Sequence, residues 1–262
     1  MRNFLFVYLL ILLLPASQAG AVTWNVNPGG TGDAPTILAA IDSCGAGDVI
    51  ELACGTYHES TTLTTMLTLK SDLTLRSAAG DPACVTIDAQ QPTDWGSVLF
   101  LDGISNVLIQ GLTITGGHAV DVFLSSNGGG AYIHSCQNIR FEDCVFTSNR
   151  GRVGGGLYVT DSEVWLEGCE ISGNEALVTG GGIGLGGSVQ ITDCLILDNT
   201  AGHGLGPDGS IWGAASSCVL TCCEKDIDQW HVYEGGLLVQ DEDCGTVAME
   251  GVDWTDLKAY YR

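Results

Sequence analysis

Two glutamates at equivalent points of a repeated segment, Glu142 and Glu167, have side chains that can bind a metal ion. Carboxylate oxygens are the ligands that Ca²⁺ prefers, and two of them with a neighbouring oxygen can hold the ion. If consecutive repeats stack, these carboxylates lie one level apart. The sequence therefore names Ca²⁺ as the candidate cofactor and these glutamates as its ligands, with two solvated carboxylates as the simpler explanation.

A second group of side chains has the chemistry of sugar recognition. Tyr132 and Tyr158 each follow a glycine triplet, and Arg140, Trp165 and Gln190 occupy one equivalent position in three successive repeats. Aromatic rings on a ridged surface stack against the apolar faces of sugars. These residues predict a partner that is a carbohydrate or a surface protein. The alternative is an external stack that only shields the backbone.

The elements that position these residues belong to an internal repeat. Three segments align without gaps, at 139–149, 164–174 and 189–199. Each carries a cysteine and an asparagine at the same two positions, so both residue types recur at a constant interval. These recurring residues are Cys144, Cys169 and Cys194, and Asn149, Asn174 and Asn199. Self-similarity at a fixed period of this length is typical of a solenoid.

Within each copy, apolar residues alternate with polar ones, which indicates β-strands. Phe141, Cys144 and Phe146 are expected to face inward, and the extra residue before each cysteine marks a corner. Stacking coils at about 4.8 Å pairs every strand with its copy above and below. The predicted fold is all-β, a right-handed parallel β-helix with a short amino-terminal capping helix.

The asparagine and cysteine rows have different predicted roles. An asparagine at a tight corner satisfies backbone groups of the turn, and stacked amides hydrogen-bond along the axis. Stacked inward cysteines are close enough to bridge, but they rarely have the torsion that a disulfide requires. We therefore expect Cys144, Cys169 and Cys194 to be free thiols and Asn149, Asn174 and Asn199 to form a ladder.

A leucine-rich repeat is the rival solenoid, because the spacing of Phe141, Cys144, Phe146 and Asn149 also satisfies its pattern. That fold needs an apolar residue two positions after the asparagine and then a helical or extended return. Gly151 fills the first requirement poorly, and the return contains a glycine triplet followed by alternating apolar residues. The β-helix is the better interpretation.

The composition limits the classes of partner. The 262 residues include 37 glycines, and the formal net charge is −22. Such an acidic chain is a poor ligand for nucleic acid or anionic membranes. Residues 1–19 have the features of a signal peptide, with Arg2, an apolar stretch and a small-x-small site at 17–19. We expect export to the cell surface, the periplasm or the medium, and no transmembrane span after cleavage.

The ends of the solenoid need caps, because an open end exposes strand edges. Residues 35–43 predict a short amphipathic helix, 49–52 the first strand, and Cys44 and Cys54 the best disulfide. The β-helix is expected over 20–217. A cysteine-rich segment over 218–262 forms either a cap or a sorting signal, with Cys218, Cys222, Cys223 and Cys244 as further disulfide candidates.

Two segments carry a resemblance to known proteins. Residues 33–42, with Gly47-Asp-Val-Ile-Glu-Leu and Gly55-Thr-Tyr, resemble the opening of pectin lyase-like β-helix proteins. The coils with Gly-Gly-Gly and Phe146-Thr-Ser-Asn149 are similar to repeats of chlamydial polymorphic outer-membrane proteins. The resemblance covers most of 24–205 and implies the fold. It does not imply one activity, because this fold hosts lyases, hydrolases, esterases and adhesins.

Matched catalytic sets are missing from the sequence. Gly202-His203-Gly204 resembles one element of polygalacturonases, but the aspartate motifs that inverting hydrolysis requires are not present. His203 is thus a candidate catalytic residue whose simpler role is in a turn. The calcium cluster and arginine of pectate lyases, and the paired aspartates of pectin methylesterases, have no counterpart here.

Three functions stay open from the sequence. The first is a non-catalytic exported protein that binds a glycan or another surface partner through the solenoid wall. The second is a polysaccharide lyase or glycoside hydrolase acting on uronic-acid-containing glycans. The third is a structural passenger without a ligand. Short, regular turns favour the first, since enzymes usually build their sites from long loops.

Overall fold

The computed structural model describes residues 20–58, 67–90, 96–120, 127–202, 211–213, 217–225, 230–232 and 237–239. The expected signal peptide and His203 lie outside these residues, and so does most of the carboxy-terminal segment. Within the described part of the chain, no helix has the length and apolarity that a membrane span requires.

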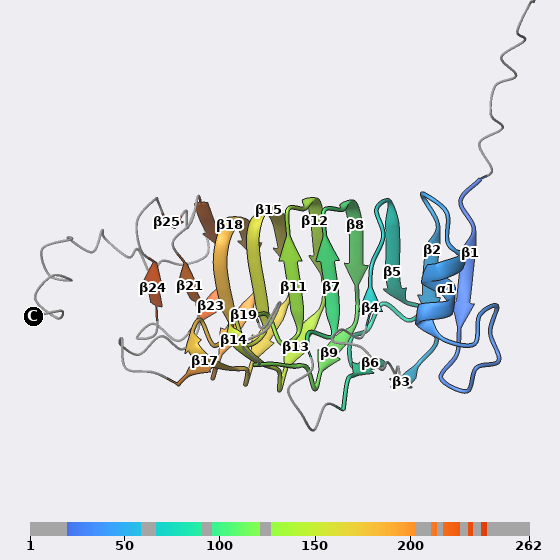
Figure 1. Ribbon diagram of the computed structural model, residues 1–262, viewed down its shortest axis with the longest axis horizontal. Helices are drawn as coiled ribbons and strands as arrows, with labels where there is room; N and C mark the ends of the chain where they lie inside the picture. Colours follow the sequence, from blue (N-terminus) through green and yellow to red (C-terminus); the bar gives the residue numbers. More distant parts are fainter. Residues whose placement is uncertain are drawn as a thin grey trace, which may run out of the picture.

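The strands stack along one axis as four walls, which confirms the predicted parallel β-helix (Figure 1). Walls 1 and 2 together form a 14-stranded sheet, because β15 (Leu157–Glu167) and β18 (Ile183–Thr192) run through both. The other strands of wall 1 are β4 (Leu67–Thr68), β7 (Leu99–Asp102), β11 (Ala131–His134), β21 (Ile211–Gly213) and β24 (Trp230–Val232). The other strands of wall 2 are β1 (Thr23–Val26), β2 (Val49–Leu52), β5 (Leu73–Ser77), β8 (Ser105–Gln110), β12 (Gln137–Glu142), β22 (Ser217–Thr221) and β25 (Leu237–Val239).

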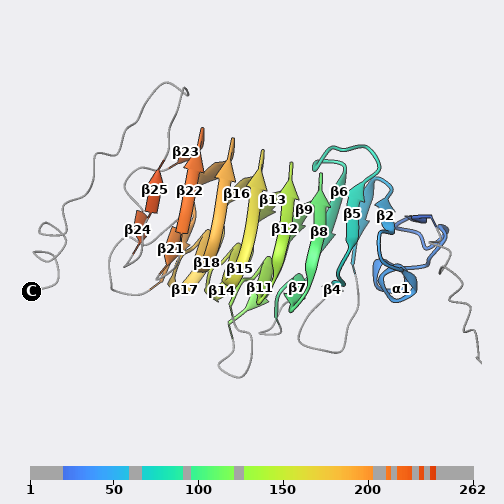
Figure 2. The ribbon, with the colours of Figure 1, turned by 90° about the horizontal axis from the view of Figure 1, so that it is seen from above.

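Walls 3 and 4 close the coil on its other sides. Figure 2 shows the successive levels from above, with the strands of one wall side by side. Wall 3 contains β3 (Gly55–Tyr57), β6 (Val85–Asp88), β9 (Thr113–Thr115), β13 (Val145–Thr147), β16 (Glu170–Ser172), β19 (Leu195–Leu197) and β23 (Glu224–Lys225). Wall 4 contains β10 (His118–Ala119), β14 (Arg150–Val153), β17 (Glu175–Thr179) and β20 (Thr200–Ala201).

Parallel pairing in constant register places like residues above one another. Ile139 pairs with Val107 on one side and Val164 on the other, and all three are buried. The inward positions expected from the alternation are at most 2% exposed, as for Phe141, Cys169 and Ile196. Burial of this alternating apolar set is the main stabilising term for each coil.

The three repeated asparagines lie inside the coil and are at most 1% exposed. Asn149 Nδ2 donates to Asn174 Oδ1 at 3.1 Å, and Asn174 Nδ2 donates to Asn199 Oδ1 at 3.0 Å. The same oxygens accept the backbone N–H of Asn149 and Asn174. Each amide therefore satisfies backbone groups that the corner would otherwise bury without partners.

The glycine triplets return the chain to wall 1 through a left-handed backbone. Gly128, Gly154 and Gly180 have φ of +66°, +68° and +66°. A Cβ at Gly154 would collide with the carbonyl oxygen of Leu157. Both the conformation and the space at this turn thus require glycine.

The amino-terminal end is covered by α1 (Ile37–Ser43), next to β1 and β2 in Figure 1. Thr36 is the N-cap and accepts from the N–H of Ala39, so the helix begins at Ile37, two residues after the predicted start at 35. The predicted first strand is β2, and the structure adds β1 below it, paired with it throughout. This strand was missed because only one of its four residues is buried.

The predicted Cys44–Cys54 disulfide is wrong. Cys54 is bonded to Cys84, with a Cα–Cα distance of 4.8 Å, and Cys44 is a free thiol. Gly55 pairs with Val85, so the bonded cysteines lie directly above one another on adjacent coils. Cys44 instead caps the end of α1. The disulfide partner of Cys54 thus follows from the register between adjacent coils and not from closeness along the sequence.

The carboxy-terminal cysteines fall beyond the predicted boundary of the β-helix at 217, which lies at the start of β22. Parallel pairing continues past it, through β22 to β25. Cys218 is buried on β22, Cys222 is disulfide-bonded, and Cys223 is a free thiol. Cys244 lies outside the described residues. Whether the remaining segment is a cap or a sorting signal stays a prediction.

Candidate functional site

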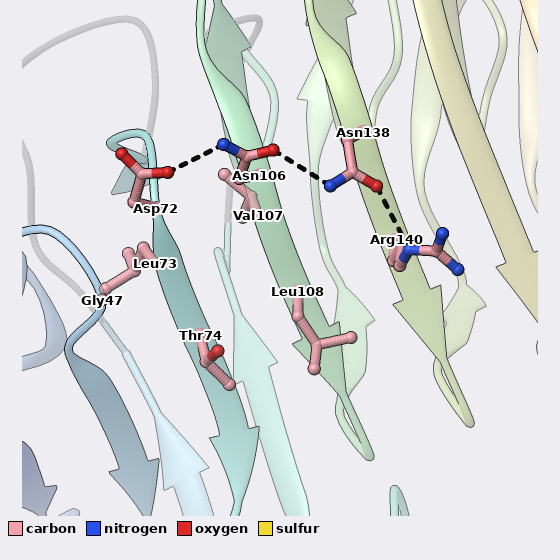
Figure 3. Close-up of a pocket in the computed structure, with 9 residues that line it drawn as sticks. All are labelled: Gly47, Asp72, Leu73, Thr74, Asn106, Val107, Leu108, Asn138 and Arg140. Atoms are coloured by element: carbon pink, nitrogen blue, oxygen red, sulfur yellow. Dashed lines mark hydrogen bonds between the residues drawn. The ribbon is translucent and has the colours of Figure 1, made fainter. Parts of the chain in front are cut away.

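A hydrogen-bonded series of polar side chains crosses the outer face of wall 2 (Figure 3). Asn106 Nδ2 donates to Asp72 Oδ1 at 2.8 Å, and Asn138 Nδ2 donates to Asn106 Oδ1 at 3.0 Å. Arg140 Nε donates to Asn138 Oδ1 at 3.2 Å. The series joins three successive coils and ends in a guanidinium.

The corner between walls 1 and 2 positions this series. Asp72, Asn106 and Asn138 each have a positive φ, of 56°, 58° and 53°. Aspartate and asparagine tolerate the left-handed region better than other residues with a side chain. One local rule thus places three short polar side chains at the same edge, one per coil.

A pocket of about 310 Å³ lies beside the series. Its wall includes Leu73, Val107 and Leu108 together with the polar side chains and the backbone at Gly47. Figure 3 shows Thr74 and Leu108 on neighbouring strands below the polar series. Leu73 and Val107 point into the core, so the pocket combines the outward side chain of Leu108 with a polar edge, and that combination suits sugars and other small polar ligands.

The predicted residues Arg140, Trp165 and Gln190 share one register position on β12, β15 and β18. The guanidinium carbon of Arg140 lies 4.7 Å from the centroid of the Trp165 ring, a cation–π contact. Arg140 also lines the pocket. The structure therefore joins this predicted row to a pocket that the sequence did not reveal.

The predicted tyrosines lie on wall 1 and stack on each other. The ring centroids of Tyr132 and Tyr158 are 5.8 Å apart, and Phe100 extends the stack at 5.2 Å from Tyr132. Burial raises the pKa of Tyr132, with Tyr158, Asp102 and Asp161 adding to the shift. Because both faces of the Tyr132 ring are covered, Tyr132 fits the shielding alternative better than a sugar platform.

The two candidate calcium ligands lie one level apart, as expected. Glu142 and Glu167 are paired on β12 and β15, and Glu142 Oε2 accepts from Gln110 Nε2 at 3.3 Å. No cluster of three or more histidine, cysteine or acidic side chains suited to a metal occurs among the described residues. The geometry provides two carboxylates, which is fewer ligands than Ca²⁺ takes.

Two of the buried thiols, Cys169 and Cys194, have raised pKa values. Hydrogen bonding between Cys144 and Cys169, together with burial, raises the pKa of Cys169 well above its usual range. The contact with Cys169, with burial, raises the pKa of Cys194 to about 12. Thiols that stay protonated in an apolar interior act as small packing groups.

Sequence reasoning missed the polar residues Asp72, Asn106 and Asn138, and also Phe100. Most of them belong to earlier coils that are longer than the regular repeat, since 32 residues separate Asn106 from Asn138. A shared signal exists in hindsight. Asn106 and Asn138 both occupy the second position of their strands, directly before a buried apolar residue.

The right-handed β-helix region model matches residues 93–251, which is more than half of the chain. The chain belongs to the right-handed β-helix family. Among solved structures, pectate lyase Pel9A has a TM-score of 0.56 at 16% identity, over 83% of this chain and 58% of the lyase. A pectin methylesterase mutant in complex with a hexasaccharide has a TM-score of 0.49 at 18% identity, over 81% of this chain and 68% of the esterase. No curated protein matches the chain.

These similarities show the fold of the β-helix protein and leave its activity open. The chain spans little more than half the length of the pectate lyase. The resemblance of the sequence is confirmed at the level of the right-handed β-helix fold, and the resemblance to the chlamydial repeats stays a prediction.

Proposed function

We propose that this exported β-helix protein binds a glycan chain along the outer face of wall 2. The observation that carries the proposal is the polar series of Asp72, Asn106 and Asn138, which ends in Arg140 beside Trp165. Sugars are bound by planar polar side chains that hydrogen-bond hydroxyl groups and by aromatic rings that pack on C–H faces.

The dimensions of the site favour an oligosaccharide. The row runs over the five consecutive strands β5, β8, β12, β15 and β18, which at about 4.8 Å per level extends for about 19 Å. The bond from Arg140 to Asn138 uses one of the five N–H donors of a guanidinium. The others suit a hydroxyl or a carboxylate of the glycan.

The test is a binding titration with neutral and uronic-acid-containing oligosaccharides. Trp165→Ala and Arg140→Ala are each expected to weaken binding at least tenfold, because each removes one of the two principal contacts. Arg152→Ala is the matched control, since it removes the same charge from the exposed face of β14. Unchanged affinity in both wall 2 variants would contradict the proposal.

A polysaccharide lyase or glycoside hydrolase is the second candidate. Its support is the fold shared with pectate lyase Pel9A and the acidic and basic side chains that lie together on wall 2, such as Glu51 and Arg76. Turnover above blank in a reducing-sugar and unsaturated-product assay would establish it. Without turnover or glycan binding, the structural passenger would be the remaining explanation.

Export of the protein and a sorting role of its carboxy-terminal segment belong to the same proposal. The apolar start of the chain supports cleavage near Gly20, with the mature protein at the cell surface, in the periplasm or in the medium. Amino-terminal sequencing of the secreted protein tests the cleavage. Deletion of 240–262 tests the sorting role, since loss of surface attachment with retained secretion would support it.

A further inference from the structure

A serine, a histidine and an aspartate are connected in series at the corner between walls 1 and 2. Ser135 Oγ lies 3.2 Å from His134 Nε2, and His134 Nδ1 lies 2.7 Å from Asp102 Oδ1. A carboxylate only accepts, so Nδ1 carries the proton and Nε2 is the acceptor for the serine hydroxyl. These are the relations of nucleophile, base and orienting acid that acyl transfer requires.

The backbone of two coils holds this geometry. His134 ends β11 directly above Asp102 at the end of β7, and their strands are paired in register. The N–H of Gly103 donates to the His134 carbonyl at 2.9 Å, and the N–H of Ser135 donates to the Thr160 carbonyl at 3.1 Å. The three side chains therefore belong to a braced corner rather than a free loop.

Ser135 has a backbone that serine rarely adopts. Its φ is +53°, in the left-handed region, and its side chain is exposed. Other corner residues of this β-helix, such as Asp72 and Asn106, share this region, so the conformation belongs to the corner and fixes the direction in which the serine side chain leaves the backbone. Here the conformation turns the hydroxyl toward the imidazole of the preceding residue.

The surroundings of the histidine indicate which substrates can approach. The side chains of His134 and Asp102 are 38% and 51% exposed, so a polymer can reach them. Asp161 Oδ2 lies 3.9 Å from His134 Nε2, and the Tyr132 ring centroid lies 6.3 Å from that of His134. Two carboxylates beside one imidazole repel an anionic acyl group, so a neutral ester is the better substrate.

We propose that Ser135, His134 and Asp102 hydrolyse a neutral carboxylic ester on a bound glycan, such as an O-acyl group on a sugar. Ser135 Oγ bonds to the acyl carbon as its proton passes to His134 Nε2. The ester C–O bond then breaks, and the departing sugar oxygen takes that proton. Nε2 then takes a proton from water as the water oxygen bonds to the acyl carbon of the acyl-serine. The bond from that carbon to Ser135 Oγ breaks, Oγ takes the proton back from Nε2, and the carboxylic acid leaves.

The choice of a glycan ester depends on the proposed function. Asn138, in the polar series of wall 2, follows three residues after Ser135 across the same corner. A chain lying on wall 2 would thus carry its substituents past the serine. The nucleophilic triad itself does not depend on glycan binding, and the two can be tested separately.

The first experiment treats the full mature chain with a fluorophosphonate probe and locates the label by peptide mass spectrometry. We expect label on Ser135, and its loss in Ser135→Ala, His134→Gln and Asp102→Asn. Ser148→Ala is the matched control, because Ser148 is also exposed with a φ of +55° but lies at a different corner. An isolated surface histidine would leave no label on serine.

The second experiment measures release of 4-nitrophenol from 4-nitrophenyl acetate. Ser135→Ala should lower the rate at least tenfold, whereas Ser148→Ala should keep it, since Ser148 lies at a different corner. Absence of label on Ser135, or equal rates in the wild type and Ser135→Ala, would overturn the triad. If the wild-type protein binds no glycan but Ser135 is still labelled, the proposed function is refuted and the triad is not.

Discussion

The amino-terminal coils and the central coils of this β-helix solve the same packing problem by different means. In the centre, residues 127–202 repeat a cysteine and an asparagine at the same interior positions, and the asparagine amides bond in series. At the amino-terminal end, residues 20–90 have a disulfide, a helix cap and one buried carboxylate that binds three donors.

The cysteines show this difference at neighbouring positions of one corner. Cys54 and Cys84 lie at the same position of adjacent coils and are disulfide-bonded. Cys144 lies one position further along its coil than these two cysteines do, and its neighbour in register on the preceding coil is Leu112. The central thiols point inward and pack. A terminal coil has a neighbour on one side only, so cross-links stabilise it where stacking is incomplete.

The largest expected effect contrasts two left-handed glycines. Gly154→Ala in the centre should cost about 4 kcal/mol, because the strained backbone and a collision with the Leu157 carbonyl add together. Gly80→Ala near the amino-terminal end has the same φ of about +66° but open space around its Cβ, and should cost about 1 kcal/mol. Urea unfolding of both variants measures the difference. Equal losses of unfolding free energy in the two variants would mean that the collision with the Leu157 carbonyl does not contribute.

Asn174→Ala tests the central amide series. It leaves the N–H of Asn149 and the carbonyl of Phe146 buried without that partner, at a cost of about 3 kcal/mol in unfolding free energy. An Asn174→Asp variant keeps the shape and the acceptor but loses the amide donor. Equilibrium denaturation that gives Asn174→Ala the same unfolding free energy as the wild type would contradict a structural role for the series.

The central coils were predictable because their signals are local and repeated. Alternation, a constant period and the asparagine position each follow from residues in one copy or its neighbour, and register then places the copies above one another. The amino-terminal coils were less predictable, since Cys54 and Cys84 are 30 residues apart and their pairing depends on the length of that coil. The weakly apolar β1 gave almost no signal.

The candidate site was predictable only in part, for the same reason. Arg140 and Trp165 lie within the regular repeat, and their contact follows from register. Asp72 and Asn106 belong to coils of different length, so only the structure brings them to that row. The relation of Ser135 to Asp102 also crosses coils, and no spacing within one repeat reveals it.

The disulfide variant has a smaller expected effect than the central amide. Cys54→Ser with Cys84→Ser should lower stability by about 2 kcal/mol, at the lower end for a closed loop, because a terminal coil can fray without exposing the rest of the core. Hydrogen exchange should quicken in α1 and β1–β3 and stay unchanged in β15–β18. Uniform loss of protection along the solenoid would show that the end and the centre unfold as one unit.

The smallest effect concerns Asp48, which is 7% exposed. Its carboxylate accepts from the N–H of Val22 at 2.8 Å, from the N–H of Gly45 at 2.9 Å and from Trp24 Nε1 at 3.2 Å. These donors lower the pKa of Asp48 below its ordinary value of 3.8. The carboxylate therefore connects β1 and the exit of α1 to the start of β2.

The sign of the pH dependence follows from that lowered pKa. A carboxyl group whose pKa is depressed in the folded state stabilises the protein above the unfolded value and loses this contribution as the pH falls through the folded value. Asp48→Asn should thus lower the melting temperature by a few degrees at pH 6, with a gap to the wild type that narrows below pH 3.8. If the difference in melting temperature between Asp48→Asn and the wild type stays constant from pH 6 to pH 2.5, the lost charge is not the cause of the destabilisation.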